Sequence, residues 1–179
     1  MNGEAEHFGP AGSAVVTGNE RRLAVSHWLL SAALDRKEAQ AQWDEHGVAL
    51  LACGGILSAI RIPAHLVWAA AGTENLEEVD RFLCRFFDGG AVFIDLHACL
   101  YYALVPGTAF WKWSALEFPG MEFLGQDTFL GVPSPGLTER RGRGYWCVPM
   151  DSPGDLTYPD EVADLARRAR DARAQGGHR

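Results

Sequence analysis

The sequence predicts a single α+β domain in which N-terminal helices and a hairpin precede a mainly antiparallel sheet. Three observations support this fold class. The chain has 179 residues, 47% of them hydrophobic, which suits one domain with one core. Its first half carries apolar residues at helical spacing. Its second half carries short runs rich in β-branched and aromatic residues, separated by Pro and Gly turns and followed by one more helix.

Two helices are expected after a flexible leader. Residues 1–20 are rich in Gly, Ala and polar residues without periodicity, so we expect them to form that leader. Over 22–34 the apolar residues recur at helical spacing, and the candidate core contacts are Leu23, Trp28 and Leu29. Asp35 followed by Glu38 is the capping-box pattern, so a second helix is expected to start there and to end near Gly47.

A hairpin and a short helix are expected next. The apolar runs 48–52 and 56–62 are separated by Gly54 and Gly55, which is typical of a turn between two paired strands. Pro63 suits the first turn of a helix, because its missing N–H group would have no partner there. A short apolar helix is therefore expected after Pro63, with its end at Gly72.

A further helix and the sheet complete the expected fold. Asn75 with Glu78 forms another capping-box pattern, and Asp88 with two glycines ends the helix that it begins. The apolar face of this helix comprises Leu76, Val79, Leu83 and Phe86. The expected strands are 91–95, 100–105, 128–132 and 145–148. A final helix opens at 158–161, where Pro and acidic residues favour a helix start, and a flexible basic tail is expected over 171–179.

Charge and composition exclude several classes of protein. A formal net charge of -7 argues against a protein that coats nucleic acid through bulk electrostatics, although local basic sites remain. The four cysteines lie far apart without a CxxC pair, which indicates buried thiols in a reducing cytoplasm. No apolar run approaches the ~20 residues that span a bilayer. We therefore expect a cytoplasmic protein without a membrane partner.

Three segments carry a resemblance to a known family. They are QWDEHGVALLACGG at 42–55, GMEFLGQDTFLGVPSP at 120–135 and GRGYWCVP at 142–149. In order and spacing they resemble the N-terminal domain of actinobacterial bifunctional DNA primase/polymerases, the prim-pol branch of the archaeo-eukaryotic primase superfamily. The resemblance implies a prim-pol-like domain over 21–170, of the size usual for one domain.

The residues expected at the catalytic positions of that family are mostly replaced. The family binds divalent metals and a nucleoside triphosphate with two acids at alternate positions of a strand, a histidine on a later strand and a further acid. Here SAIRIPA places Arg61 and Pro63 at the acidic pair, and LYYALV places Leu100 at the histidine. Only Glu122 matches an acidic position. An arginine repels a metal ion and attracts phosphate or carboxylate. We therefore expect a stand-alone domain that is catalytically degenerate and acts as a nucleotide-binding, nucleic-acid-binding or regulatory protein.

Two alternatives remain open. Asp95 and His97 lie two residues apart in FIDLH, on one face of the expected strand, so with Glu122 they could form a metal site for Mg or Mn in an active nucleotidyltransferase. The plain interpretation is a strand-end pair that bonds to the following loop, with Glu122 a solvated acid. The other alternative is a protein-interaction module that docks a protein partner and binds no nucleic acid.

Arginine and tryptophan residues supply the candidate binding groups. Arg61 lies in an apolar strand, where a charge is costly unless paired, so it either contacts phosphate or forms a salt bridge to an acid on a neighbouring strand. The loop before the expected strand 145–148 carries three further candidate phosphate-binding residues, Arg140, Arg141 and Arg143. They could equally form a solubilising hairpin tip. Trp111 and Trp113 alternate as strand residues would; they could stack single-stranded bases, or divide between core and surface.

Overall fold

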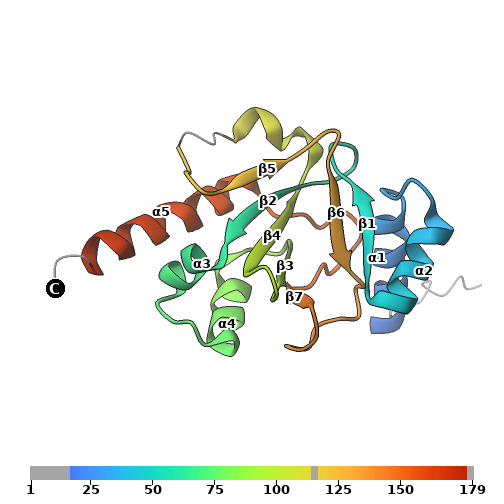
Figure 1. Cartoon of the computed structure of the whole chain (residues 1–179), viewed down its shortest axis with the longest axis horizontal. Helices are drawn as coiled ribbons and strands as arrows, with labels where there is room; N and C mark the ends of the chain where they lie inside the picture. Colours follow the sequence, from blue (N-terminus) through green and yellow to red (C-terminus); the bar gives the residue numbers. More distant parts are fainter. Residues whose placement is uncertain (1–16, 114–116, 177–179) are drawn as a thin grey trace, which may run out of the picture.

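A five-stranded antiparallel sheet lies at the centre of the molecule, and a two-stranded antiparallel ribbon packs beside it (Figure 1). The computed structural model describes residues 17–113 and 117–176. The strand order of the central sheet is β5–β2–β4–β3–β7, with bounds Glu122–Leu124, Ser58–Pro63, Leu100–Val105, Ala91–Asp95 and Gly144–Val148. The ribbon pairs β1 (Val48–Ala52) with β6 (Phe129–Pro133). The predicted α+β class with a mainly antiparallel sheet is confirmed.

The first helix starts and ends earlier than the sequence predicts. Helix α1 spans Gly18–Leu30 because Thr17 and Glu20 form a capping box, in which each backbone N–H donates to the other side chain. Residues 1–16 of the predicted leader lie outside the described residues. The prediction that Leu23 belongs to the core is wrong, since this side chain is 58% exposed, whereas Leu29 is fully buried.

The second helix is confirmed at both ends. Helix α2 spans Arg36–His46. The Asp35 side chain accepts hydrogen bonds from the backbone N–H groups of Lys37 and Glu38, which satisfies two donors at the helix start. Gly47 ends the helix with a φ of 73°, a left-handed conformation that glycine adopts without strain.

The predicted hairpin between the two strands that follow is wrong. β1 pairs with β6, whereas β2 pairs with β4 and β5. Beyond the end of β1, the Cys53 N–H donates to the Thr128 carbonyl, so the chain continues along the ribbon instead of turning back. The glycines at 54 and 55 mark a turn correctly, but a turn signal does not specify which strand becomes the partner.

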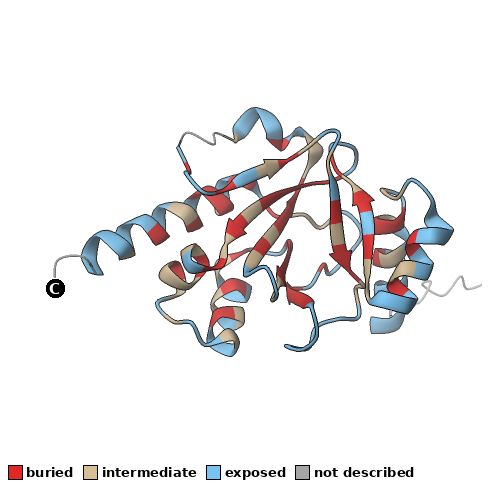
Figure 2. Ribbon diagram, in the orientation of Figure 1, coloured by how far each residue is buried: buried red, intermediate tan, exposed pale blue. Residues whose placement is uncertain are grey.

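The central sheet carries a hydrophobic core on each face, because successive residues of its strands point to opposite sides. One face presents Ile60, Ala103 and Ile94 to helices α3 (Ala64–Ala71), α4 (Leu76–Phe86) and α5 (Pro159–Gly176). The other face presents Ala59, Leu104 and Phe93 to the ribbon and to α1 and α2. Figure 2 shows this division, with buried residues on the strands and exposed residues on the outer sides of the helices.

The helices on the first face begin and end much as expected. Helix α3 ends at Gly72, and α4 begins at Asn75, whose side chain accepts from two backbone N–H groups. Helix α5 continues to Gly176, through most of the stretch that was predicted to be a flexible basic tail. No helix in the described part of the chain has both the length and the apolar character required to cross a bilayer.

Two sequence predictions around the aromatic and basic loops are wrong. Trp111 and Trp113 do not alternate on a strand, because Pro106 is followed by a 3-10 helix, η1, over Gly107–Lys112. Trp113 turns inward and stacks on Phe118 at a centroid distance of 4.8 Å, while Trp111 is 87% exposed. The basic loop does not join a hairpin either, since its flanking strands, β6 and β7, lie in different sheets.

Candidate functional site

Cross-strand register places a row of polar and aromatic side chains on the sheet face that looks toward the ribbon. Arg61 on β2 lies directly opposite Glu122 on β5 and Tyr102 on β4. Tyr102 in turn lies opposite Phe93 on β3, and Phe93 lies opposite Trp146 on β7. Because directly opposed residues of antiparallel strands share a face, all five side chains point to the same side of the sheet.

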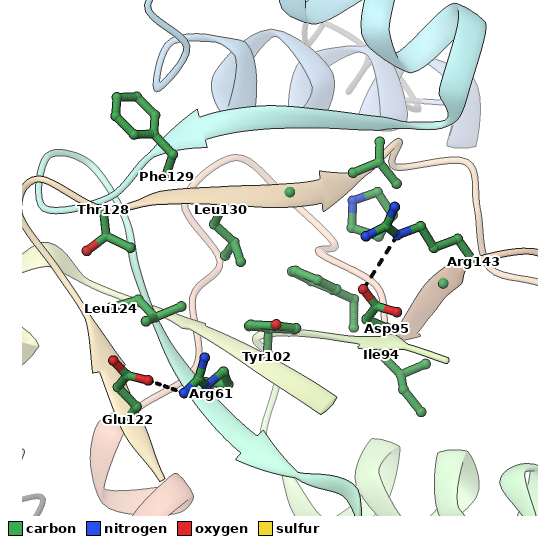
Figure 3. A pocket seen from close by; sticks show the side chains of 15 residues that line it. Arg61, Ile94, Asp95, Tyr102, Glu122, Leu124, Thr128, Phe129, Leu130 and Arg143 are labelled. Carbon is green, nitrogen blue, oxygen red and sulfur yellow. Dashed lines mark ion pairs between the residues drawn. The ribbon is translucent and has the colours of Figure 1, made fainter. Parts of the chain in front are cut away.

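A cleft with a volume of ≈ 400 Å³ lies between this row and the ribbon (Figure 3). The central sheet contributes Arg61, Tyr102 and Glu122 to its lining, and β6 contributes Phe129 and Leu130. The volume lies within the range of roughly 300–1,000 Å³ typical of small-molecule sites. The cleft therefore has both the size and the mixture of polar and apolar groups of a binding site.

Two ion pairs lie in the cleft on either side of the Tyr102 ring. The Arg61 guanidinium pairs with the Glu122 carboxylate, and Arg143 Nε lies 3.5 Å from Asp95 Oδ2 (Figure 3). Both arginine side chains keep contact with water, with exposed fractions of 42% for Arg61 and 67% for Arg143. Partly hydrated ion pairs are weak, so an incoming anion can compete with the carboxylate for the guanidinium.

Tyr102 forms an aromatic surface between the two pairs. Its ring stacks on Phe93 with a centroid distance of 5.0 Å and an interplanar angle of 20°. Burial raises the pKa of the Tyr102 hydroxyl, and the Asp95 carboxylate acts in the same direction, while Arg61 and Arg143 oppose both effects. The hydroxyl is therefore neutral at physiological pH and is available as a hydrogen-bond donor.

Asp95 and His97 do not share a strand face, so that prediction is corrected. β3 ends at Asp95, and His97 lies in the turn that follows, exposed to solvent and outside the lining of the cleft. The Asp95 carboxylate accepts hydrogen bonds from the backbone N–H groups of His97 and Ala98 at 2.9 and 3.0 Å. This is the strand-end contact of the plain interpretation, in which a short acidic side chain closes a turn.

Arg140 and Arg141 do not line the cleft. Arg140 extends toward helix α4, where its guanidinium lies 3.3 Å from Asp80 Oδ2. Arg141 pairs with Glu139 in its own loop and is exposed. Of the three loop arginines, only Arg143 is brought to the same site as Arg61.

The four positions singled out by the family resemblance share one face of the sheet. Arg61 is opposite Glu122, and Pro63 is opposite Leu100, one row further along. The salt bridge expected for Arg61 with an acid on a neighbouring strand is confirmed, and Glu122 is that acid. Among the described residues, no three His, Cys, Asp or Glu side chains gather closely enough to hold a metal ion.

Comparisons of the chain with protein-family models, with curated proteins and with solved structures return no match. Two guanidinium groups, a neutral hydroxyl and apolar walls suit a flat ligand that carries negative charge at its edge.

Sequence reasoning missed Tyr102 and the β6 residues that line the cleft. The run LYYALV contains the signal for Tyr102, because alternation places it between Leu100 and Leu104 on one face of β4. Phe129 and Leu130 gave no such signal, since their position over the sheet depends on the pairing of β6 with β1.

Proposed function

We propose that this protein is a non-catalytic, prim-pol-like domain that binds a nucleotide, or the end of a nucleic acid, in the cleft. The observation that carries the proposal is the placement of Arg61 and Arg143 at opposite sides of Tyr102 in one cleft. The planar guanidinium of arginine matches phosphate through two parallel hydrogen bonds. The apolar surfaces of Leu124, Phe129 and Leu130 provide contacts for a base.

The ion pairs define how binding would work. In the free protein each arginine is held by a carboxylate, Arg61 by Glu122 and Arg143 by Asp95. A phosphate displaces the carboxylate, which can turn toward water because the Glu122 side chain is 52% exposed. Binding then exchanges one hydrated ion pair for another with better geometry, and its affinity decreases as salt concentration rises.

The test is nucleoside triphosphate binding measured by calorimetry with and without magnesium. Arg61→Ala and Arg143→Ala are expected to weaken binding by about tenfold or more, since charged hydrogen bonds contribute roughly 1.5–3 kcal/mol. The matched control is Arg141→Ala, which removes an exposed arginine from the same loop without touching the cleft. Equal affinities for the wild type and both cleft variants would show that the nucleotide does not bind in the cleft.

Glu122→Gln separates this proposal from the enzymatic alternative. If Glu122 only competes for Arg61, its neutral amide frees the guanidinium, and nucleotide affinity stays the same or increases. If Glu122 belongs to a metal site for nucleotidyl transfer, the same change decreases magnesium- or manganese-dependent affinity. Template-directed primer extension that is lost in Glu122→Gln would establish the enzyme and overturn the proposal.

A further inference from the structure

A second hollow adjoins the cleft and has a different character. Its volume is ≈ 550 Å³, and Thr128 lines both it and the cleft, so the two adjoin at this residue. Its aromatic lining consists of Phe110 and Trp111 from η1 and Phe123 from β5. The described residues that line it include no charged side chain. We call it the aromatic groove.

Two of the aromatic rings that line the groove are largely exposed. The Trp111 side chain is 87% exposed and that of Phe110 is 60% exposed. Phe110 packs edge-on against both Trp111 and Phe123, with centroid distances of 5.4 and 5.9 Å. These edge-on contacts leave most of the outermost ring, Trp111, open to a planar ligand.

Three glycines hold the segments of the groove together. A Cβ atom on Gly107 would clash with the Gly55 carbonyl oxygen, and one on Gly54 would lie 2.6 Å from the Gln126 Cα. A Cβ atom on Gly125 would lie 2.8 Å from the ring of Phe123. The start of η1, the loop after β1 and the loop after β5 thus meet at backbone contact distance, which only glycine permits at these positions.

From these features we infer that the aromatic groove stacks the bases of single-stranded nucleic acid whose terminal phosphate lies in the cleft. The inference rests on the proposed function and extends it from a nucleotide to a strand. Bases are flat and uncharged, which suits a groove of aromatic rings without charge, while phosphates suit the arginines of the cleft. The two hollows adjoin at Thr128, and consecutive residues of the edge strand β5 face them, Glu122 the cleft and Phe123 the groove, so a nucleic-acid strand that crosses this edge reaches both.

A single strand fits these features better than a duplex. Stacking on Trp111 requires an unpaired base with an open face, which duplex DNA does not offer. The net charge of -7 also disfavours the many phosphate contacts by which proteins hold a duplex. Contact would therefore be short, with one phosphate group in the cleft and one or two bases in the groove.

The test compares three ligands by fluorescence anisotropy or competition. They are a mononucleotide, a 5′-phosphorylated oligonucleotide of about eight residues, and an abasic strand with the same phosphates. The oligonucleotide is expected to bind at least about fivefold more tightly than the abasic strand, since only the oligonucleotide has bases to stack on the aromatic rings. Trp111→Ala is expected to reduce oligonucleotide affinity at least about fivefold more than it reduces mononucleotide affinity.

Tyr158→Ala is the matched control, because it removes an aromatic side chain that is 63% exposed and lines neither hollow. Equal affinities for the oligonucleotide and the abasic strand, or no effect of Trp111→Ala, would overturn the stacking inference. Binding of the mononucleotide would still support the proposed function in that case. If the wild-type protein does not bind the mononucleotide, the proposed function is wrong. An oligonucleotide that depended on Trp111 but not on Arg61 would support the groove and reject the cleft.

Discussion

At the scale of single residues, Asp80 has the most unusual environment outside the cleft. It projects from α4 onto the opposite face of the sheet, and its side chain is only 13% exposed. The Tyr145 hydroxyl donates to both of its carboxylate oxygens at 3.1 Å, and Arg140 pairs with it. Burial raises the pKa of Asp80, while the bonds from Tyr145 and Cys147 and the charge of Arg140 partly offset this effect.

The raised pKa of Asp80 predicts how stability depends on pH. Because the folded protein holds the Asp80 proton more tightly than the unfolded chain, whose Asp pKa is near ~3.9, the contribution of this group decreases as pH rises through the folded pKa. The free energy of unfolding of the wild type, relative to Asp80→Asn, should decrease as pH rises from about 4 toward neutrality. Urea unfolding of both proteins at a series of pH values measures this difference; an increase with pH would contradict the assignment.

At the scale of elements, the glycine junction between the loop after β1 and the loop after β5 fixes the ribbon against the sheet. Gly54 has a φ of 91°, and no space exists for a side chain, because the Cα and N atoms of Gln126 lie only 2.6 and 2.7 Å from where a Cβ would be. Gly55, the next residue, has open space around its Cβ position. The two neighbours therefore make a natural pair for comparison.

Gly54→Ala is expected to reduce the free energy of unfolding by roughly 1–2 kcal/mol from backbone strain alone, and by more where Gln126 must shift. Gly55→Ala should change it by less than about 1 kcal/mol, because neither clash nor left-handed backbone is involved. Chemical denaturation of the three proteins provides the measurement. Similar decreases in the free energy of unfolding of both variants would show that the close contact at Gly54 does not determine the stability of the junction.

The elements themselves were largely predictable, while their pairing was not. The strands 91–95 and 100–105 and the caps at Asp35 and Asn75 follow from local spacing and side-chain chemistry, and the structure has them at those positions. The hairpin was wrong because glycines specify a turn but β6, far along the chain, supplies the partner. Register is set by packing over the whole sheet, which no local window contains.

The same distinction applies to the site. An acid beside Arg61 was predictable, because a charge in an apolar strand requires a partner, and Glu122 is that partner. The pairing of Arg143 with Asp95 was not predictable, since it depends on how the loop before β7 returns to the end of β3. The prediction that Asp95 and His97 share a strand face was wrong for a local reason. The Asp95 carboxylate accepts hydrogen bonds from N–H groups of the turn, so the strand ends before His97.

At the scale of the whole molecule, both cores share the central sheet, so neither can form without it. Leu51 on β1 is fully buried in the core beside the ribbon, and its neighbour Leu50 is 57% exposed. Residues of α3, α4 and α5 form the core on the other face. A sheet that is buried on both sides couples the two cores into one cooperative unit.

Leu51→Ala is expected to lower the free energy of unfolding by about 2–5 kcal/mol, and Leu50→Ala by less than about 1 kcal/mol. If the cores are coupled, each variant will show one unfolding transition, and far-UV circular dichroism and tryptophan fluorescence will give the same midpoint for that variant. Two separate transitions, only one of them shifted by Leu51→Ala, would show that the ribbon unfolds independently of the helices on the opposite face.

The pairing of β1 with β6 also determines when during synthesis the molecule can become complete. β1 leaves the ribosome about 80 residues before the strand that satisfies its backbone groups, and most of the central sheet is made in between. Until β6 arrives, β1 has no strand to pair with, because β6 is its partner in the ribbon. Because β6 also forms one wall of the cleft, the candidate site is among the last parts of the molecule to assemble.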